Sequence, residues 1–209
     1  MRVEHQHYGW TDAGPRWAHG YLLPTILRAI QGLSEGKPLS VVDMGCGNGY
    51  VASRLAGHGH SVVGIDVSRD GIEIARSAYP AIRFEVCSIY DEDLHGIIGQ
   101  PVDCVISLEV IEHLFYPKRL LEQAHRILKS GGHLLLSTPY HGYLKNLAFS
   151  VLNGWDRHFD VQRGGGHIKF FSRRTLARMI QGAGFRKPRF TGAGRVPWLW
   201  KAMIMIAEK

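Results

Sequence analysis

A glycine-rich turn after a short apolar run is the strongest constraint on how this chain folds. Residues 39–44 are rich in the β-branched side chains of a buried strand, and Gly45, Gly47 and Gly49 follow at alternate positions. Glycine lets the backbone turn tightly and approach a ligand closely, and a helix that begins behind such a turn favours a negative group. The pattern therefore predicts a strand, a ligand-binding turn and a helix in direct succession.

The rest of the chain continues this alternation. A parallel sheet built from βαβ units is expected, because strand-type runs alternate with longer helical patterns. We expect strands at 39–44, 61–66, 82–86, 102–107 and 133–137, and helices at 16–33, about 50–57, 69–79, 117–129 and 143–152.

Gly131 and Gly132 are expected to cap the helix that ends at Lys129, and Ser172 to cap a helix that runs to Gly182. Segments 185–190 and 202–207 are expected to form a closing hairpin. The predicted fold is a doubly wound, Rossmann-like α/β domain with a seven-stranded sheet, mostly parallel with an antiparallel last strand.

The spacing of the glycines restricts the ligand. Dinucleotide folds use G-x-G-x-x-G, whereas position 50 here is Tyr50, so this fingerprint fails. Asp43, two residues before the first glycine, can hold the loop amides by hydrogen bonds and face a cationic ligand. Asp66, at the end of the second strand, can bind both hydroxyls of a ribose. The sequence therefore predicts a nucleoside site without the usual pyrophosphate turn.

Four segments, 41–50, 62–68, 102–114 and 126–139, resemble in order the motifs of class I S-adenosylmethionine (SAM)-dependent methyltransferases of the type 11/12 kind. The similarity extends from about residue 39 to the C-terminus. It implies a SAM-dependent methyltransferase domain over 39–209, with an acceptor-pocket insertion at about 139–170. Residues 1–38 are expected to form an N-terminal helical lid, in which Tyr8, Trp10 and Trp17 either fold over the SAM pocket or pack a helix onto the sheet.

The resemblance also implies roles for the residues that match these motifs. The methionine part of SAM is expected against Gly45 and Gly47, with Cys46 as a small residue of the same loop and Asp43 in support. The ribose hydroxyls are expected on Asp66. Val67 is expected to cover the adenine, and Ser88 and Ile89 to lie in the loop at the adenine edge. The backbone of Leu108 is expected near the methionine ammonium group.

The segment Glu109 to His113 is the best candidate for the chemistry. If it is helical, Glu109, Glu112 and His113 share one face. They then provide most of a site for a divalent metal, Mg²⁺ or Zn²⁺, with His167 or His158 as a further ligand. Alternatively, His113 acts as a base without a metal and Glu112 braces it. This E-x-x-E-H resembles the motif of ubiquinone-pathway O-methyltransferases, and that of small-RNA 2′-O-methyltransferases, which bind a metal through it.

Composition sets broad limits on the class of protein. The chain has 209 residues, of which 45% are hydrophobic and 21% charged, as in one globular domain. It contains no apolar run of membrane-spanning length, and its three cysteines have no metal-type spacing, so a cytoplasmic protein is expected. Residues 169–209 hold ten Lys or Arg and one acid. This basic region either forms a solvent-exposed face or attracts phosphates, nucleic acid or an anionic membrane surface.

The expected function is methylation of a small-molecule acceptor, with oxygen as the expected target. Trp155, His158 and Phe159 lie in the insertion that is expected to build the acceptor pocket, and are either substrate contacts or loop packing. The alternatives are an RNA 2′-O-methyltransferase that uses a divalent metal, and a SAM-binding protein without catalysis. The identity of the acceptor, the methylated atom and the oligomeric state are left open.

Overall fold

The computed structural model describes residues 9–16, 18–155 and 166–209, so Tyr8, Trp17, His158 and Phe159 lie outside the described residues. The strands are β1 (Ser40–Met44), β2 (Ser61–Asp66), β3 (Arg83–Val86), β4 (Val102–Leu108), β5 (Leu128–Pro139), β6 (Arg186–Ala193) and β7 (Ala202–Glu208). The helices are α1 (His19–Ser34), α2 (Tyr50–Ala56), α3 (Arg69–Ala78), α4 (Leu94–Ile98), α5 (Pro117–Ile127), α6 (Tyr143–Val151) and α8 (Arg173–Gly182), with a short 3₁₀ helix η1 (Ile111–His113).

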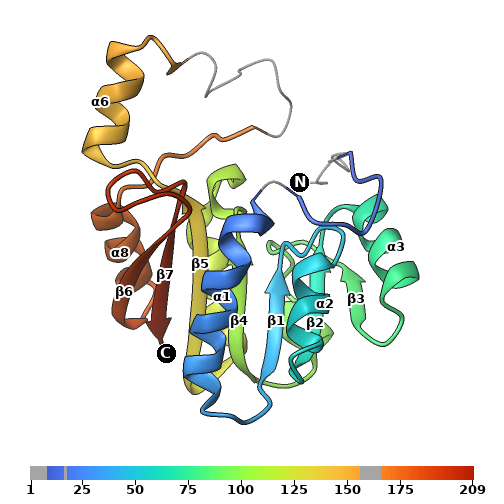
Figure 1. Cartoon of the computed structure of the whole chain (residues 1–209). Coiled ribbons are helices and arrows are strands. Elements are labelled where there is room, and N and C mark those ends of the chain that lie inside the picture. The colour runs from blue at the N-terminus through green and yellow to red at the C-terminus, as the bar shows by residue number, and fades with distance from the viewer. Residues whose placement is uncertain (1–8, 17, 156–165) are drawn as a thin grey trace.

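The strands form one seven-stranded sheet in the order β3-β2-β1-β4-β5-β7-β6 (Figure 1). Strands β1 to β5 pair in parallel, and β7 pairs antiparallel with both β5 and β6. The predicted fold class, a doubly wound α/β sheet with an antiparallel last strand, is confirmed.

Helices cover both faces of this sheet, because consecutive strand residues point to opposite sides. Val41 packs in the cluster that includes residues of α1, α2 and α3, whereas its neighbour Val42 packs in the cluster with α4, α5 and α8. Both faces are therefore apolar, as expected for strands buried on two sides.

Helix α1 belongs to the core. Leu22, Ile26 and Ile30 recur every fourth residue and are at most 1% exposed, so they form one buried stripe against the sheet. The helix begins at His19, three residues later than the pattern predicted. Within the expected lid region, the segment 9–16 contacts the glycine loop, through the Trp10 ring and the carbonyls of Asp12 and Gly14.

The junction of α5 and β5 differs from the prediction. Gly131 and Gly132 do not cap the helix: α5 ends at Ile127, and β5 begins at once with Leu128. Leu128 is buried and pairs with Val102, and the register of the β4–β5 pair shifts just beyond it. Gly131, with φ of 76°, bends the chain within this irregular stretch. A Gly-Gly pair suits a strand irregularity as well as a helix end, and burial of Leu128 favours the strand.

Helix α6 follows β5 and stands off the body of the domain (Figure 1). None of its residues is buried. Of the helices in the described part of the chain, none combines the length and the apolar character that crossing a membrane requires.

The expected cap of α8 is present. Ser172 Oγ accepts a hydrogen bond from the Thr175 amide (3.1 Å), and Thr175 Oγ1 accepts one from the Ser172 amide (2.9 Å). This reciprocal pair satisfies two amides that a helix start leaves without partners.

We predict that Ser172→Ala lowers the free energy of unfolding by about 1 kcal/mol, because the Ser172 hydroxyl is the acceptor for the Thr175 amide in the first turn of the helix. Urea denaturation followed by circular dichroism measures the change. Ser77→Ala, at an exposed position of α3, is the matched control and is expected to cause no loss. Equal stability of the Ser172 variant and the wild type would contradict the prediction.

Candidate active site

The carboxyl ends of β1, β2 and β4 meet at one edge of the sheet, where ligands bind in open α/β folds. Asp66 organises this edge: its Oδ2 accepts the Gly47 amide and its Oδ1 accepts the Ser68 amide, both at 2.8 Å. Burial raises the pKa of Asp66, and these hydrogen bonds oppose that rise. Each carboxylate oxygen can accept more than one hydrogen bond, so Asp66 can still accept ribose hydroxyls.

Asp43 lies behind the same loop and is 1% exposed. Its Oδ2 has no hydrogen-bond partner among the described residues. Burial, reinforced by the nearby Asp66, raises the pKa of Asp43 to about 8. A buried carboxyl oxygen without a donor is unusual, and it suits a ligand that brings a donor or a positive charge.

The glycine loop is constrained by protein packing as well as by ligand access. Gly45 and Gly47 have φ of 85° and 52°, in the left-handed region. A Cβ at Gly45 would lie 2.4 Å from Val110 Cγ2, and one at Gly47 would lie 2.3 Å from Trp10 Cζ2. Trp10, from the N-terminal segment, therefore lies directly on the loop. Cys46 between the two glycines is buried, and burial raises the pKa of its thiol, which suits a packing residue.

The N-terminal segment is tied to the glycine loop by hydrogen bonds. Asn48 Nδ2 donates to the carbonyls of Asp12 and Gly14, both at 2.8 Å. The Tyr79 hydroxyl donates to the Ala13 carbonyl at 2.8 Å. Asn48 is fully buried and was not singled out from the sequence, although a polar residue inside a glycine loop is a usable signal.

The turn after β3 holds the two residues expected at the adenine edge. Ser88 donates its amide to Asp91 Oδ2 (2.9 Å), while the Ile89 side chain is buried in the core. Only the backbone of Ile89 can therefore face a ligand. Val67 is partly exposed beside Asp66, and Leu108 ends β4 next to the loop.

The prediction that Glu109, Glu112 and His113 share one face of a helix is wrong. Glu109 has φ of 56°, and helical structure is confined to the three residues of η1. The Glu109 amide and carboxylate both bond to Ser137 Oγ, at 3.0 and 2.8 Å. A left-handed, non-glycine residue held by two bonds is typical of a functional position.

Glu112, His113 and His167 are nevertheless brought together. One ligand atom from each lies within 4.8 Å of the other two, and Glu112 Oε1 is 3.9 Å from Nε2 of both histidines. Thr138 donates to the other oxygen, Oε2, at 3.0 Å, while Oε1 accepts no hydrogen bond among the described residues. A His113 ring nitrogen lies 3.1 Å from the Gly166 carbonyl. A carboxylate with two imidazoles is a donor set that suits a divalent cation.

The electrostatics of this cluster extend to α1. Burial, and then the charge of Glu109, raises the pKa of Glu112, while burial raises that of Glu109 to about 7. Burial, followed by the charges of Glu109 and Glu112, also raises the pKa of Tyr21, so this side chain lies within electrostatic range of the two acids. Sequence reasoning did not identify Tyr21, because nothing local distinguishes it from a packing residue.

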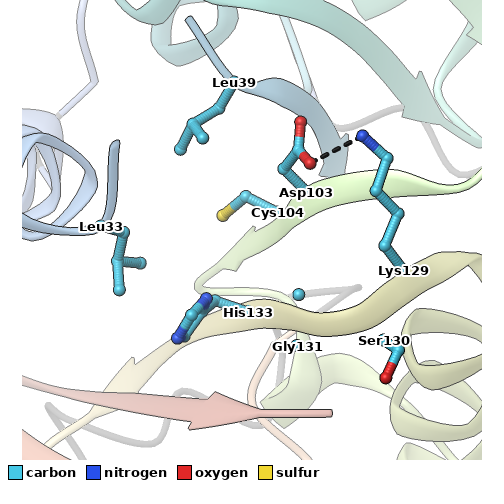
Figure 2. A pocket seen from close by; sticks show the side chains of 9 residues that line it. Leu33, Leu39, Asp103, Cys104, Lys129, Ser130, Gly131 and His133 are labelled. Carbon is cyan, nitrogen blue, oxygen red and sulfur yellow. Dashed lines mark hydrogen bonds and ion pairs between the residues drawn. The ribbon is translucent and has the colours of Figure 1, made fainter. Parts of the chain in front are cut away.

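A hollow lies at the opposite edge of the sheet, where the parallel strands begin (Figure 2). It has a volume of about 220 Å³ and is lined by residues such as Leu39, Asp103 and His133. Its charged groups satisfy each other, since Lys129 Nζ lies 2.7 Å from Asp103 Oδ1. None of the expected site residues lines it, so the carboxyl edge remains the candidate active site.

The strand order and the acid-held glycine loop are those of a class I SAM-dependent methyltransferase, and this is what the comparisons with known proteins show. A family model described as "Methyltransferase domain" matches residues 16–187, and the chain belongs to this family.

Three proteins illustrate the similarity. The chain is 26% identical over 186 residues to the ubiquinone biosynthesis O-methyltransferase of Coxiella burnetii, covering 88% of this chain and 79% of that one. It is 28% identical over 199 residues to the mitochondrial ubiquinone biosynthesis O-methyltransferase of Homo sapiens, covering 86% and 52%. The solved magnesium protoporphyrin IX methyltransferase of Synechocystis PCC 6803, with bound SAH, shares the fold at a TM-score of 0.67 and 16% identity, covering 90% and 82%.

We predict that Asp66→Asn weakens binding of S-adenosylhomocysteine (SAH) about tenfold or more, because bonds to a carboxylate contribute about 1.5–3 kcal/mol. Isothermal titration calorimetry measures the affinity. Glu73→Gln, exposed on α3, is the control and is expected to bind as the wild type does. A folded Asp66 variant with unchanged affinity would show that this carboxylate does not hold the ribose.

We also predict a pH dependence from Asp43. Its pKa is about 8 in the folded chain and about 4 when unfolded, so the folded state retains a proton that the unfolded state loses. The stability contributed by this group is present below about pH 4 and is lost as the pH rises towards 8. Urea denaturation at several pH values should show a shallower decline for Asp43→Asn than for the wild type. Parallel declines would refute the assignment.

Proposed function

We propose that this methyltransferase transfers the methyl group to a hydroxyl of a small-molecule acceptor, and that Glu112 and His113 serve the reaction. The observation that carries the proposal is the convergence of Glu112, His113 and His167, in a segment whose Val110 packs against Gly45 of the glycine loop. The similarity to the ubiquinone biosynthesis O-methyltransferases supports oxygen as the target.

The proposed SAM site uses the glycine loop and its acids. Asp66 holds the ribose hydroxyls, Gly45 and Gly47 approach the methionine part, and Asp43 supports the loop. The remaining contacts come from Cys46 in the loop, Val67 over the adenine, the turn at Ser88 and Ile89, and the backbone of Leu108. The partnerless Asp43 oxygen and the remaining acceptor capacity of Asp66 support this arrangement.

Bound SAM supplies an electrophilic methyl group: the sulfur–methyl bond breaks with its electron pair left on sulfur, a bond to the acceptor oxygen forms, and the hydroxyl proton leaves. The residues of the chain orient the acceptor and accept that proton. Where no metal is bound, His113 is the proposed base, because its Nε2 lies 3.9 Å from the Glu112 carboxyl group, whose negative charge would stabilise the protonated imidazole. Holding both reactants in line is expected to supply much of the rate.

We further propose that Glu112, His113 and His167 bind a divalent cation, Mg²⁺ or Zn²⁺. The partnerless Glu112 Oε1, facing two imidazoles, supports this donor set. Such an ion would lower the pKa of a coordinated hydroxyl. Glu109, the other proposed ligand, is bonded to Ser137 and lies outside this group of three.

An RNA 2′-O-methyltransferase remains the second candidate. The ten basic residues of 169–209, against one acid, favour it. Salt-sensitive RNA binding in the low-micromolar range would raise this candidate above a small-molecule acceptor, and its absence would lower it.

We predict that methylation of hydroxyl-bearing acceptors is abolished by EDTA and restored by added Mg²⁺ or Zn²⁺. His113→Ala and His167→Ala should lower the activity at least tenfold, because each removes a ligand of the ion. Transfer of the labelled methyl group of SAM to an acceptor panel measures this. His58→Ala, far from the site and exposed, is the control.

Two results would overturn parts of this proposal. Full activity in EDTA would discard the metal and leave His113 as a base. Methylation confined to nitrogen or carbon acceptors would discard the assignment of oxygen.

A further inference from the structure

Two consecutive hydroxyl residues near the end of β5 each hold one acidic side chain of the candidate active site. Ser137 Oγ donates to Glu109 Oε1 at 2.8 Å, and Thr138 Oγ1 donates to Glu112 Oε2 at 3.0 Å. Ser137 and Thr138 are both at most 1% exposed. Consecutive residues of a strand point to opposite sides of the sheet, so the two hydroxyls hold the two carboxylates in different places.

This arrangement distinguishes the two acids as ligands. Glu109, whose carboxylate accepts the Ser137 hydroxyl, lies outside the group that Glu112 forms with the two histidines. The Thr138 hydroxyl bonds to Oε2 of Glu112 and leaves Oε1 for another partner. Oε1 lies 3.9 Å from Nε2 of each imidazole and accepts no hydrogen bond from a described residue. Oε1 is therefore the oxygen that Glu112 presents to the histidines.

The backbone around Glu112 is fixed independently of Thr138. The Glu112 carbonyl accepts the amides of Ile168 and Lys169 at 2.9 and 3.0 Å, which fastens the segment that carries His167 to η1. Thr138 adds the direction of the carboxylate, because a hydrogen bond to one of its oxygens limits the rotation of the group.

The His113 ring is oriented in a similar way. Its Nδ1 lies 3.1 Å from the Gly166 carbonyl oxygen. A carbonyl can only accept a hydrogen bond, so Nδ1 carries the hydrogen and Nε2 is the nitrogen on the side of Glu112. Both side chains are thus held by a second group behind them, which is usual for residues that bind a metal ion.

We propose that Thr138 is a positioning residue of the active site, whose hydroxyl keeps Oε1 of Glu112 directed at the imidazoles of His113 and His167. This inference rests on the proposed function, in which Glu112 is either a ligand of the divalent cation or the partner of His113. Loss of the hydroxyl would leave a buried oxygen without its donor and let the carboxylate turn away from the imidazoles.

Ion binding by the full chain saturated with SAH tests this inference, with Zn²⁺ alone as the probe. Calorimetry of the wild type and of Glu112→Gln identifies the ion that this carboxylate binds. Thr138→Val keeps the shape of the side chain and removes the hydroxyl, so it should weaken that binding at least about tenfold, as is typical for groups behind a ligand. Thr138→Ser keeps the hydroxyl and should bind nearly as the wild type does.

The controls separate positioning from a purely structural role. Thr191→Val removes a hydroxyl from a partly buried threonine of β6 and should leave ion binding unchanged. Both Thr138 variants should bind SAH as the wild type does. Equal ion affinity of Thr138→Val and the wild type overturns the inference. An equal loss in the Val and Ser variants, or a parallel loss of SAH binding, also overturns it, since the residue then only supports the fold.

Failure of the proposed metal site is a separate result, because the wild type reveals it. If the wild type binds no ion that Glu112→Gln removes, the metal is rejected and Glu112 acts on His113 alone. Methyl transfer to hydroxyl acceptors then decides the inference. Thr138→Val should lower kcat at least about tenfold with an unchanged KM for SAM, and Thr138→Ser should restore it.

Two outcomes of the transfer assay contradict different statements. An unchanged kcat in Thr138→Val overturns the inference and leaves the proposed function intact. Absence of transfer from SAM to any hydroxyl acceptor by the wild type, with SAH binding intact, rejects O-methylation itself and this role of Thr138 with it.

Discussion

The hydrogen bond from the Gly47 amide to Asp66 is the interaction on which the organisation of the active-site edge depends. It joins the turn after β1 to the end of β2 at 2.8 Å, and the second oxygen of Asp66 accepts the Ser68 amide at the start of α3. A single carboxylate thereby fixes the loop between two neighbouring strands. The N-terminal segment then packs on this loop through Trp10, so the loop, the helix and the lid-like segment are positioned together.

The second constraint is the burial of acidic groups at one edge of the sheet. Asp43 and Glu112 are each 1% exposed and Glu109 is half-buried, and burial raises the pKa of all three. Such groups are costly unless they meet a proton, a cation or a donor. The loop side can meet that need with SAM, and the Glu112 side with two histidines and a metal ion.

Predictions that rested on local chemistry agree well with the structure. The strand at 61–66 and the helix cap at Ser172 match, because side chains within a few residues decide them. Two predictions were wrong for an identifiable reason. Gly131 bends a strand instead of ending a helix, since burial of Leu128 extends β5. Glu109 does not share a helical face with Glu112 and His113, since Ser137 on the neighbouring strand β5 holds its backbone amide and its carboxylate by hydrogen bonds.

The sequence by itself determined the class of protein: the alternation of strands and helices, the glycine spacing and the two acids suffice for a SAM-binding α/β fold. Only the tertiary structure decided which distant side chains share the site. His167 reaches Glu112 because the segment after the insertion bonds to η1 through the Glu112 carbonyl. Tyr21 carries no local signal, since the groups that act on it, Lys201 and the two glutamates, come from elsewhere in the chain. The physical reason is that local patterns report the periodicity of burial, whereas a site depends on contacts made across the sheet edge.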